Sequence, residues 1–585
     1  MSRTLVQPNG WAALRLPNDS VKVLQVVPNT TIALGKYGSF PSNLIIDRPF
    51  HLTYEVQDKR EGENFSRLRV VPGTELNAEA LAETNDDEAE EADPNDTVIV
   101  PEDGEELTLV DESGKVLVRS NKEVLDDRAR QTLTAEEIEE LKHNGTAAGQ
   151  ELIAKLLLSH TALDEKTAYS LAKYKLLKTK KYIRRFTVFP LDIPRLAQWQ
   201  LEERDPSKIM EIREEMLGLI GCWADVHFAA PPADGATQTN GPPDGRWLMV
   251  DDTGGLLVGA MAERMGILRP STEVQNSWSA EVASKNNGTT EDAPKEAQTN
   301  ASSKGKAGHE RPEASADEER PRKRRPQADD FEVHYKANNT ITLVHQNPQA
   351  NLSLLKHYDY DHADPNPSYP YHPLFTNLLP LTWLQLLQPE DDLTYAEDPP
   401  DVSAEELASW KTTRRGNYHR KRRRWARTRH IVDQARAGGF CGLAVASTMD
   451  PVSILRSALP LLAGGAPIAI YSPNIEPLSQ LMDCFTVARR AAWVSDPPPE
   501  IQDRAHADLE HWEGSPEFPI NPTLLLGATV QTSRAKRWQV LPGRTHPLMT
   551  GRGGAEGYLF TGWRAIPVEG KVSARGKFAK KRTEA

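Results

Sequence analysis

Short apolar runs separated by glycine and proline dominate the first 70 residues. Four such runs follow one another at close spacing: Val21–Val27, Thr30–Leu34, Asn43–Ile46 and His51–Val56. This spacing is typical of a small antiparallel barrel or sandwich. Two more strand-like runs, Leu107–Val110 and Lys115–Arg119, follow the acidic stretch Glu83–Asp96, which we interpret as a solvated loop. We therefore predict an N-terminal β-barrel domain with an acidic loop over residues 1–125.

Helical patterns begin after this domain and become strongly basic. Thr134 and Glu137 have the spacing of a capping box, and the leucines between Leu152 and Leu157 give the next helix an apolar face. The following stretch, Thr167–Arg185, holds seven Lys or Arg residues between positions 173 and 185 and no acid among them. Two sets of these residues have helical spacing: Lys173, Lys180 and Arg184, and Lys178, Lys181 and Arg185. We predict a helical basic segment over residues 126–205, which is either a nucleic-acid surface or a solvated helix face.

The remainder of the chain alternates between apolar strands and helices. The expected strands are Trp247–Val250, Thr340–His345, Phe440–Ser447, Pro467–Tyr471, Thr523–Val530 and Gly557–Trp563. Helices are expected between them, among others at Pro206–Gly221, Leu256–Met265, Leu352–His357, Val452–Leu462 and Pro477–Ala492. Such alternation predicts a mostly parallel, doubly wound sheet with helices on both faces. We assign residues 206–268, 331–387 and 431–570 to this one α/β domain.

Two polar insertions and a tail interrupt or follow the α/β pattern. Over Ser279–Asp330 the only hydrophobic residue besides alanine is Val282, so residues 269–330 are predicted to be disordered. This insertion ends in a basic run, Arg320–Pro326, which is a nuclear-import signal or a charged linker. The second insertion, 388–430, holds ten Lys or Arg residues between Lys411 and Arg429. The tail, 571–585, is basic as well.

Aromatic residues interleave with the charges of the second insertion. Tyr418 and Trp425 lie within this basic run. Basic charge with aromatics favours neutralisation of phosphates together with stacking on bases. Nuclear targeting and a purely solvated segment are the alternatives.

Composition narrows the class of protein. Apolar residues make up 38% of the 585, below the usual share of globular chains, so part of the length is expected to be unfolded. The net charge of −13 argues against a nucleic-acid partner only as an average, because the charge is segregated into blocks. Cys222, Cys441 and Cys484 are far apart and give no metal-binding spacing. Without an apolar signal core or a membrane-length apolar run, we expect a soluble intracellular protein.

The turn after the first α/β strand resembles a nucleotide pocket that lacks its ligand-binding residues. In S-adenosylmethionine methyltransferases this place carries an acid followed by three glycines at alternate positions. Here Asp251 keeps the acid and Gly255 the middle glycine, but Thr253 and Leu257 replace the outer two. Side chains at those positions oppose close approach of a ligand to the backbone. We predict no cofactor binding by this chain.

The ends of two further strands also lack the residues that a methyltransferase site needs. The second strand ends in Gln346 and Asn347 where a carboxylate should hold the ribose of a cofactor. After the fourth strand, enzymes that methylate base nitrogens present Asp or Asn with prolines. Here the chain runs through Ser447 and Thr448, and Asp450 comes several residues late. No catalytic triad, metal cluster or phosphate loop is found elsewhere in the sequence.

Several segments together resemble one family, the non-catalytic subunits of eukaryotic tRNA (adenine-58-N1) methyltransferase. They are Thr134–Leu141, Lys166–Lys181, Asp251–Gly266, Gly551–Tyr558 and, most specifically, Arg537–Pro547 with the sequence RWQVLPGRTHP. The resemblance implies an N-terminal β-barrel joined through a helical linker to a Rossmann-like methyltransferase fold that has lost S-adenosylmethionine binding. It implies no catalytic residue in this chain, because the catalytic aspartate of the partner aligns with Ser447.

The resemblance also implies partners. It predicts a heterotetramer of two catalytic and two non-catalytic subunits that acts in the nucleus on tRNA, with S-adenosylmethionine bound by the catalytic subunit. We expect tRNA-binding residues in the basic helix and in the Arg-Thr-His-Pro turn: Lys173, Lys178, Lys180, Lys181, Arg184, Arg185, Arg544 and His546. For Arg544 and His546 a contact with the partner and a structural role are equally open.

Two other functions remain compatible with the sequence. One is an active methyltransferase with a divergent pocket, and the other is a general RNA-binding adaptor without a methyltransferase partner. Binding of S-adenosylmethionine to the isolated chain separates the first from a non-catalytic subunit.

Overall fold

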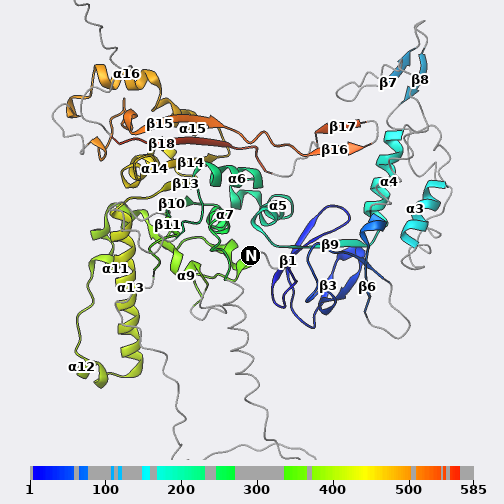
Figure 1. The fold of residues 1–585 in the computed structure, drawn as a ribbon, viewed down its shortest axis with the longest axis horizontal. Helices are drawn as coiled ribbons and strands as arrows, with labels where there is room; N and C mark the ends of the chain where they lie inside the picture. The colour runs from blue at the N-terminus through cyan, green and yellow to red at the C-terminus, as the bar shows by residue number, and fades with distance from the viewer. Residues whose placement is uncertain are drawn as a thin grey trace, which may run out of the picture.

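A computed structural model describes most of the two predicted domains (Figure 1). It describes residues 4–57, 65–76, 107–110, 116–120, 148–158, 168–230, 245–270, 335–364, 372–501, 509–541, 544–547 and 554–566. The expected capping box at Thr134, the insertion 279–330 with its basic run and the tail 571–585 lie outside the described residues. None of the described helices is long and apolar enough to cross a membrane.

The N-terminal unit is an antiparallel sheet wrapped around its own core. Its strand order is β2 (Val21–Gln25), β1 (Trp11–Arg15), β9 (Arg185–Pro190), β5 (Thr53–Val56) and β6 (Leu68–Val70). Two more strands, β3 (Thr31–Ala33) and β4 (Ser39–Pro41), pair with each other and cover the same core. Leu14, Phe40 and Phe186 are among its fully buried side chains, and the rings of Phe40 and Phe186 stack at 4.8 Å. The expected antiparallel β-domain is confirmed.

The central strand of this sheet comes from an unexpected part of the chain. β9 pairs with both β1 and β5, although the sequence analysis placed its residues in a helical segment. The basic helix ends at Tyr182, so Arg185 belongs to a strand and not to the helix. Asn43–Ile46, expected as a strand, falls on a short 3-10 helix at Ser42–Leu44. The strands β7 (Leu107–Val110) and β8 (Val116–Ser120) form a separate hairpin.

Two helices precede β9 in the chain, and two more lead from it to the second unit. α3 (Ala148–Leu158) packs against α4 (Ala168–Tyr182), the predicted basic helix. α5 (Ile193–Glu203) follows β9, and the side chain of Asp192 caps its first turn. The stretch predicted as one helix from Pro206 is divided into a short 3-10 turn at Pro206–Ile209 and α6 (Glu214–Trp223).

The second unit is a seven-stranded sheet. Its order is β12 (Leu378–Thr382), β11 (Thr340–His345), β10 (Arg246–Asp251), β13 (Gly442–Ala446), β14 (Pro467–Ser472), β18 (Tyr558–Arg564) and β15 (Leu525–Gln531). The first five strands are parallel, and β18 runs antiparallel to both of its neighbours. This is the predicted doubly wound sheet, with β12 as a strand that the sequence analysis missed.

Alternation along the strands builds one core on each face. Trp247 and Met249 of β10 belong to the core under α5, α6 and α7 (Leu256–Arg264). Leu248 and Val250 belong to the opposite core, which helices cover on the outside: α10 (Trp383–Leu387), α13 (Thr412–Arg436), α14 (Pro451–Ala458) and α15 (Glu476–Asp483). Two-residue periodicity thus makes a fully buried strand the centre of the domain.

The predicted second insertion contains ordered elements. α11 (Leu393–Ala396) and α12 (Ala404–Ser409) precede α13, whose 25 residues include the whole run Thr412–Arg429. α13 begins beside α12, well away from the sheet, and its C-terminal end packs into the domain (Figure 1). The non-helical segment 397–403, α12 and the first turns of α13 therefore project from the α/β domain (Figure 1).

A long β-extension leaves the sheet in the other direction. Beyond β15 and before β18 the chain forms the hairpin of β16 (Trp538–Leu541) and β17 (Arg544–Pro547). β16 contacts α4, so this hairpin reaches across to the helix that leads into β9 of the N-terminal sheet (Figure 1).

The close packing of the central strands yields a test. A Cβ atom on Gly442 would lie 2.7 Å from the carbonyl oxygen of Ala224 and 3.0 Å from the Trp247 ring. Because backbone cannot yield there, we expect Gly442→Ala to destabilise the domain by about 1–3 kcal/mol. Gly218→Ala in α6, where a Cβ meets nothing within 4 Å, is the control and should stabilise by up to about 1 kcal/mol. Equal thermal midpoints for the two variants would contradict this packing.

Candidate functional site

The order of the parallel strands reverses beside β10. From β10 the chain proceeds to β11 and β12 on one side and to β13 and β14 on the other. In doubly wound sheets, ligands bind at the carboxyl ends of the strands at such a reversal. Asp251 ends β10 and Ser447 directly follows β13, so the structure places both predicted residues at this point.

Both oxygens of the Asp251 carboxylate accept hydrogen bonds from the turn and helix that follow it. One oxygen accepts from the backbone N–H of Thr253 at 2.6 Å and from its hydroxyl at 2.5 Å. The other oxygen accepts from the N–H of Val258 at 3.0 Å. Burial raises the pKa of the Asp251 carboxyl, while these hydrogen bonds act to lower it. The acid is buried at 6% exposure, and its hydrogen bonds are to its own loop.

Thr253 and Leu257 close the start of helix α7. The Thr253 hydroxyl accepts from the N–H of Leu257 at 3.0 Å, and both residues are buried. Free N–H groups at a helix start are what attract a phosphate or carboxylate. Here side chains of the turn already satisfy the N–H groups of Leu257 and Val258. The Leu257 side chain itself lies in the core and does not line a pocket.

A leucine segment covers the glycine turn. Gly255 has a φ of +90°, and a Cβ there would lie 3.2 Å from both Leu352 Cα and Leu355 Cγ. The N–H of Leu354 donates to the carbonyl of Gly254 at 3.0 Å. Leu352 and Leu355 are buried. The glycines therefore serve the close approach of the chain's own backbone instead of a ligand.

Sequence reasoning missed this cover. It predicted a helix near Leu352–His357, and the structure has a 3-10 helix at Ser353–Tyr358. The available signal was the sequence Asn-Leu-Ser-Leu-Leu just after β11, since apolar residues follow a strand end where a cofactor site needs polar ones. Gln346 and Asn347 at that strand end are exposed. The ring of His345 is held within the same turn, because its Nδ1 lies 2.6 Å from the carbonyl oxygen of Asn347.

Ser447 is tied to the neighbouring strand. Its hydroxyl donates to Asp252 Oδ2 at 2.5 Å, and the N–H of Thr448 donates to the same oxygen at 3.0 Å. Asp450 accepts from the N–H groups of Val452 and Ser453 and so caps α14. Both carboxylates near the expected base-binding position therefore stabilise the loops that carry them. The arrangement offers no positioned carboxylate for proton transfer to or from a base.

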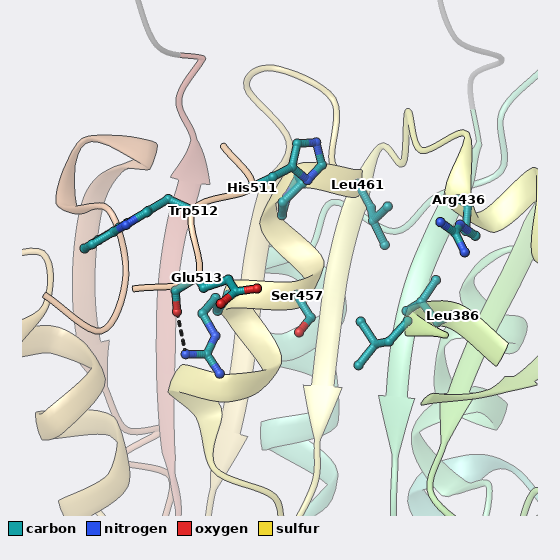
Figure 2. A pocket seen from close by; sticks show the side chains of 10 residues that line it. Leu386, Arg436, Ser457, Leu461, His511, Trp512 and Glu513 are labelled. Atoms are coloured by element: carbon teal, nitrogen blue, oxygen red, sulfur yellow. Dashed lines mark hydrogen bonds between the residues drawn. The ribbon is translucent and has the colours of Figure 1, made fainter. Parts of the chain in front are cut away.

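A hollow of the α/β domain lies elsewhere (Figure 2). It measures about 510 Å³ and lies between α10, the end of α13, α14 and the loop of Trp512. Arg436 and Leu461 on its wall lead into β13 and β14, so the hollow is at the amino ends of the parallel strands. Arg456 within it donates to the carbonyl of Glu513 at 2.8 Å. This is the edge of the sheet opposite to where nucleotides bind.

The basic helix α4 presents part of the predicted tRNA surface. The Lys178 ammonium lies 4.6 Å above the ring of Tyr174, and that of Lys181 lies 5.2 Å from the ring of Tyr182. Neither lysine has a carboxylate partner among the described residues. Lys173 is exposed on the same helix. Cation–π contacts align these side chains without neutralising their charge.

Three predicted residues belong to the structure of the N-terminal unit. Arg185 is buried on β9, where it pairs with Glu75 at 2.6 Å and with Glu55 at 3.4 Å. Lys180 pairs with Asp19 at 2.5 Å. Arg184 is half-buried between α4 and β9, and its carbonyl accepts from Val56. The helical spacing that grouped Arg184 and Arg185 with the lysines was wrong, because the helix has ended before them.

The Arg-Thr-His-Pro segment forms strand β17. Its backbone pairs Arg544 with Leu541 and His546 with Gln539. The His546 ring is half-buried and its Nδ1 lies 2.9 Å from the carbonyl of the next residue, Pro547. Arg537 anchors the base of the hairpin, because it pairs with Glu202 of α5 and Glu214 of α6. The motif thus builds an arm that is fixed to the body and touches α4.

Aromatic residues of the second basic run are not presented for stacking on bases. The Tyr418 hydroxyl donates to the carbonyl of Pro400 at 3.1 Å, and its ring meets Trp410 edge-on at 5.7 Å. Trp425 is half-buried, with Arg429 5.5 Å from its ring. Of the two predicted contacts of this run, the structure therefore does not support stacking of Tyr418 and Trp425 on bases.

The closed turn makes a pH-dependent prediction. Thr253→Val removes the acceptor of Leu257 N–H and a donor to Asp251 in a buried place, which should cost about 1–3 kcal/mol. The lost donor lets the pKa of Asp251 rise further, so ionised Asp251 is less well held in the variant. The cost should therefore grow as pH rises from 4 to 7. Denaturant unfolding at both pH values measures it, with exposed Thr31→Val as control; a pH-independent cost contradicts the network.

Comparison with known proteins places the chain in a family. The model of the Gcd10p family matches residues 5–411. A tRNA (adenine(58)-N(1))-methyltransferase non-catalytic subunit of Aspergillus fumigatus is 42% identical over 99% of this chain and 95% of the relative. The subunit of that name from Aspergillus oryzae is also 42% identical, over 99% and 95%. That of Schizosaccharomyces pombe is 24% identical over 99% and 95%.

Solved structures are more distant. A SAM-dependent O-methyltransferase from Thermotoga maritima superposes over 97% of both chains with a TM-score of 0.35 and 7% identity. The assignment therefore depends on the sequence matches, which span half of the chain and more. The chain belongs to the Gcd10p family.

Proposed function

We propose that this chain is the non-catalytic subunit of a tRNA (adenine-58-N1) methyltransferase and that it binds no S-adenosylmethionine. The observation that carries the proposal is the self-satisfied turn between β10 and α7. Asp251 and Thr253 accept from the N–H groups of Thr253, Leu257 and Val258, and Leu352 and Leu355 cover Gly255. The methyl donor then belongs to a catalytic partner of similar fold, in agreement with the names of the relatives.

The assembly we propose contains two catalytic and two non-catalytic subunits and acts on tRNA in the nucleus. A folded tRNA is larger than one methyltransferase domain, so a second subunit extends the surface that contacts phosphates. The basic run Arg320–Pro326 supports nuclear import.

The tRNA surface we propose begins at α4. Lys173, Lys178 and Lys181 remain from the set expected on sequence grounds, and the β16–β17 arm with Arg544 and His546 reaches the same helix. Lys180 and Arg185 form ion pairs within the N-terminal unit, and the backbone carbonyl of Arg184 accepts from Val56. RNA contact here is electrostatic and independent of sequence.

Calorimetry tests the loss of cofactor binding. We expect no heat when S-adenosylmethionine is titrated into the isolated chain, and one bound methyl donor per pair of subunits in the assembled complex. The reason is that side chains of the turn already bond the N–H groups of Leu257 and Val258, and leucines cover Gly255. The catalytic subunit is the positive control. Saturable binding to the isolated chain would instead establish an active enzyme with a divergent pocket.

Charge reversal tests the helix surface. In the assembled complex, Lys178→Glu with Lys181→Glu should weaken tRNA binding and lower the slope of log affinity against log salt by about 0.9 for each lost phosphate contact. Lys208→Glu with Lys356→Glu changes the charge equally on the body of the protein and is the control. An unchanged slope in the α4 variant would remove this helix from the RNA surface.

A further inference from the structure

Helix α13 carries dense positive charge away from the body of the protein. Its 25 residues span about 37 Å at 1.5 Å per residue. Ile431, Val432 and Ala435 near its C-terminal end are buried in the core of the α/β domain. The preceding turns project with α12 beside their far end (Figure 1). The C-terminal end of the helix is thus rooted in the domain, while its N-terminal turns project from it.

One face of α13 is neutralised by the chain itself. The segment that leads from α11 to α12 runs along it, and Arg422 pairs with Asp401 at 2.9 Å. Lys421 pairs with Glu397 at 3.3 Å. Further along, Arg429 lies 3.8 Å from Asp433. The three cations Lys421, Arg422 and Arg429 of this face therefore each lie beside a carboxylate.

The opposite face has no such balance. Arg420, Arg423, Arg424 and Arg427 follow the spacing i, i+3, i+4, i+7, which places them on one side of a helix. All four are exposed, and none has a carboxylate partner among the described residues. Arg420 donates to Asn417 at 2.5 Å, and Arg423 donates to the carbonyl of His419. We call these four residues the open arginine face.

Such a face is unfavourable for the isolated helix. Like charges three and four residues apart destabilise a helix by about 0.2–0.5 kcal/mol per pair. A solvated helix usually mixes charges of both signs, as the other side of α13 does. An anionic partner removes this repulsion.

The composition of the face selects the class of partner. Beyond the arginines it presents Thr413, Gly416 and Asn417, with no apolar side chain. A protein partner needs an apolar centre in its interface, and a membrane needs an apolar helix face. Guanidinium groups match phosphate with two parallel hydrogen bonds. The aromatic residues of the helix face the other way, so the contact is with a backbone and not with stacked bases.

We propose that the open arginine face binds the phosphate backbone of RNA. The four arginines cover about 10 Å along the helix axis, over which a duplex strand presents about three phosphates. The proposal rests on tRNA being the ligand of the complex and adds a second contact surface. α13 lies on the far side of the sheet from α4 (Figure 1), so the two basic helices meet different parts of the RNA.

A matched pair of variants tests the proposal in the assembled complex. Arg423→Gln with Arg427→Gln removes two charges from the open face, and Lys421→Gln with Arg429→Gln removes two from the neutralised face. We expect the first to weaken tRNA binding and to lower the salt slope by about 1.8, at about 0.9 per contact. The second should leave the slope unchanged. Arg423→Lys with Arg427→Lys keeps the charge and should restore the slope.

The outcomes separate this inference from the proposed function. Equal slopes for wild type and the Arg423→Gln, Arg427→Gln variant overturn the assignment of α13, even if the α4 variant still loses affinity. If the wild-type complex binds tRNA no more tightly than the catalytic subunit alone, the proposed function itself fails. Unfolding does not imitate the expected result, because removal of like charges stabilises the helix; circular dichroism of the complex checks this.

Discussion

The local structure at the switch point, where the order of the parallel strands reverses beside β10, depends on one interaction. This interaction is the hydrogen bonding of the Asp251 carboxylate to its own turn. A carboxylate in a buried place must be fully hydrogen-bonded, since burial disfavours its charged form. The donors that satisfy it are the N–H of Thr253 in the turn, the N–H of Val258 in the first turn of α7 and the Thr253 hydroxyl. The same groups cannot also bind an anionic ligand. A single set of hydrogen bonds thereby stabilises the loop and removes the property for which this loop is used in nucleotide-binding folds.

The leucine cover completes what these hydrogen bonds begin. Gly254 and Gly255 keep left-handed backbone conformations, which glycine adopts without strain. In this chain the freedom serves contact with Leu352, Leu354 and Leu355. Burying such side chains contributes about 1.5–3 kcal/mol each, so opening the site for a small molecule is costly. The switch point has become part of the core, which suits a domain whose task is to hold its shape.

Much of this was visible in the sequence, and the rest failed for identifiable reasons. Thr253 and Ser447 could be recognised because each breaks a local pattern of residue types at a fixed spacing. β9 could not, because a strand that pairs with β1 and β5 across more than a hundred residues is set by non-local contacts, and the lysines before it extend a helical pattern. The direction of each arginine on α13 likewise depends on the segment 397–410 that packs against it. Spacing predicts faces, but only tertiary structure decides which face is covered.

Segregation of charge along the chain gives a protein of net negative charge two separate basic surfaces, α4 and the open arginine face. A chain with a net charge of −13 repels RNA on average, so binding requires cations concentrated where acids are absent. α4 and the open arginine face meet that condition by different routes. On α4 the lysines lie against tyrosine rings, and on α13 the acids are gathered on one side of the helix and leave the other bare. Screening in salt limits each surface to about 8–10 Å, so neither can act for the other across the sheet. A closed pocket between two separate basic surfaces is what a scaffold that orients an extended RNA for a neighbouring active site requires.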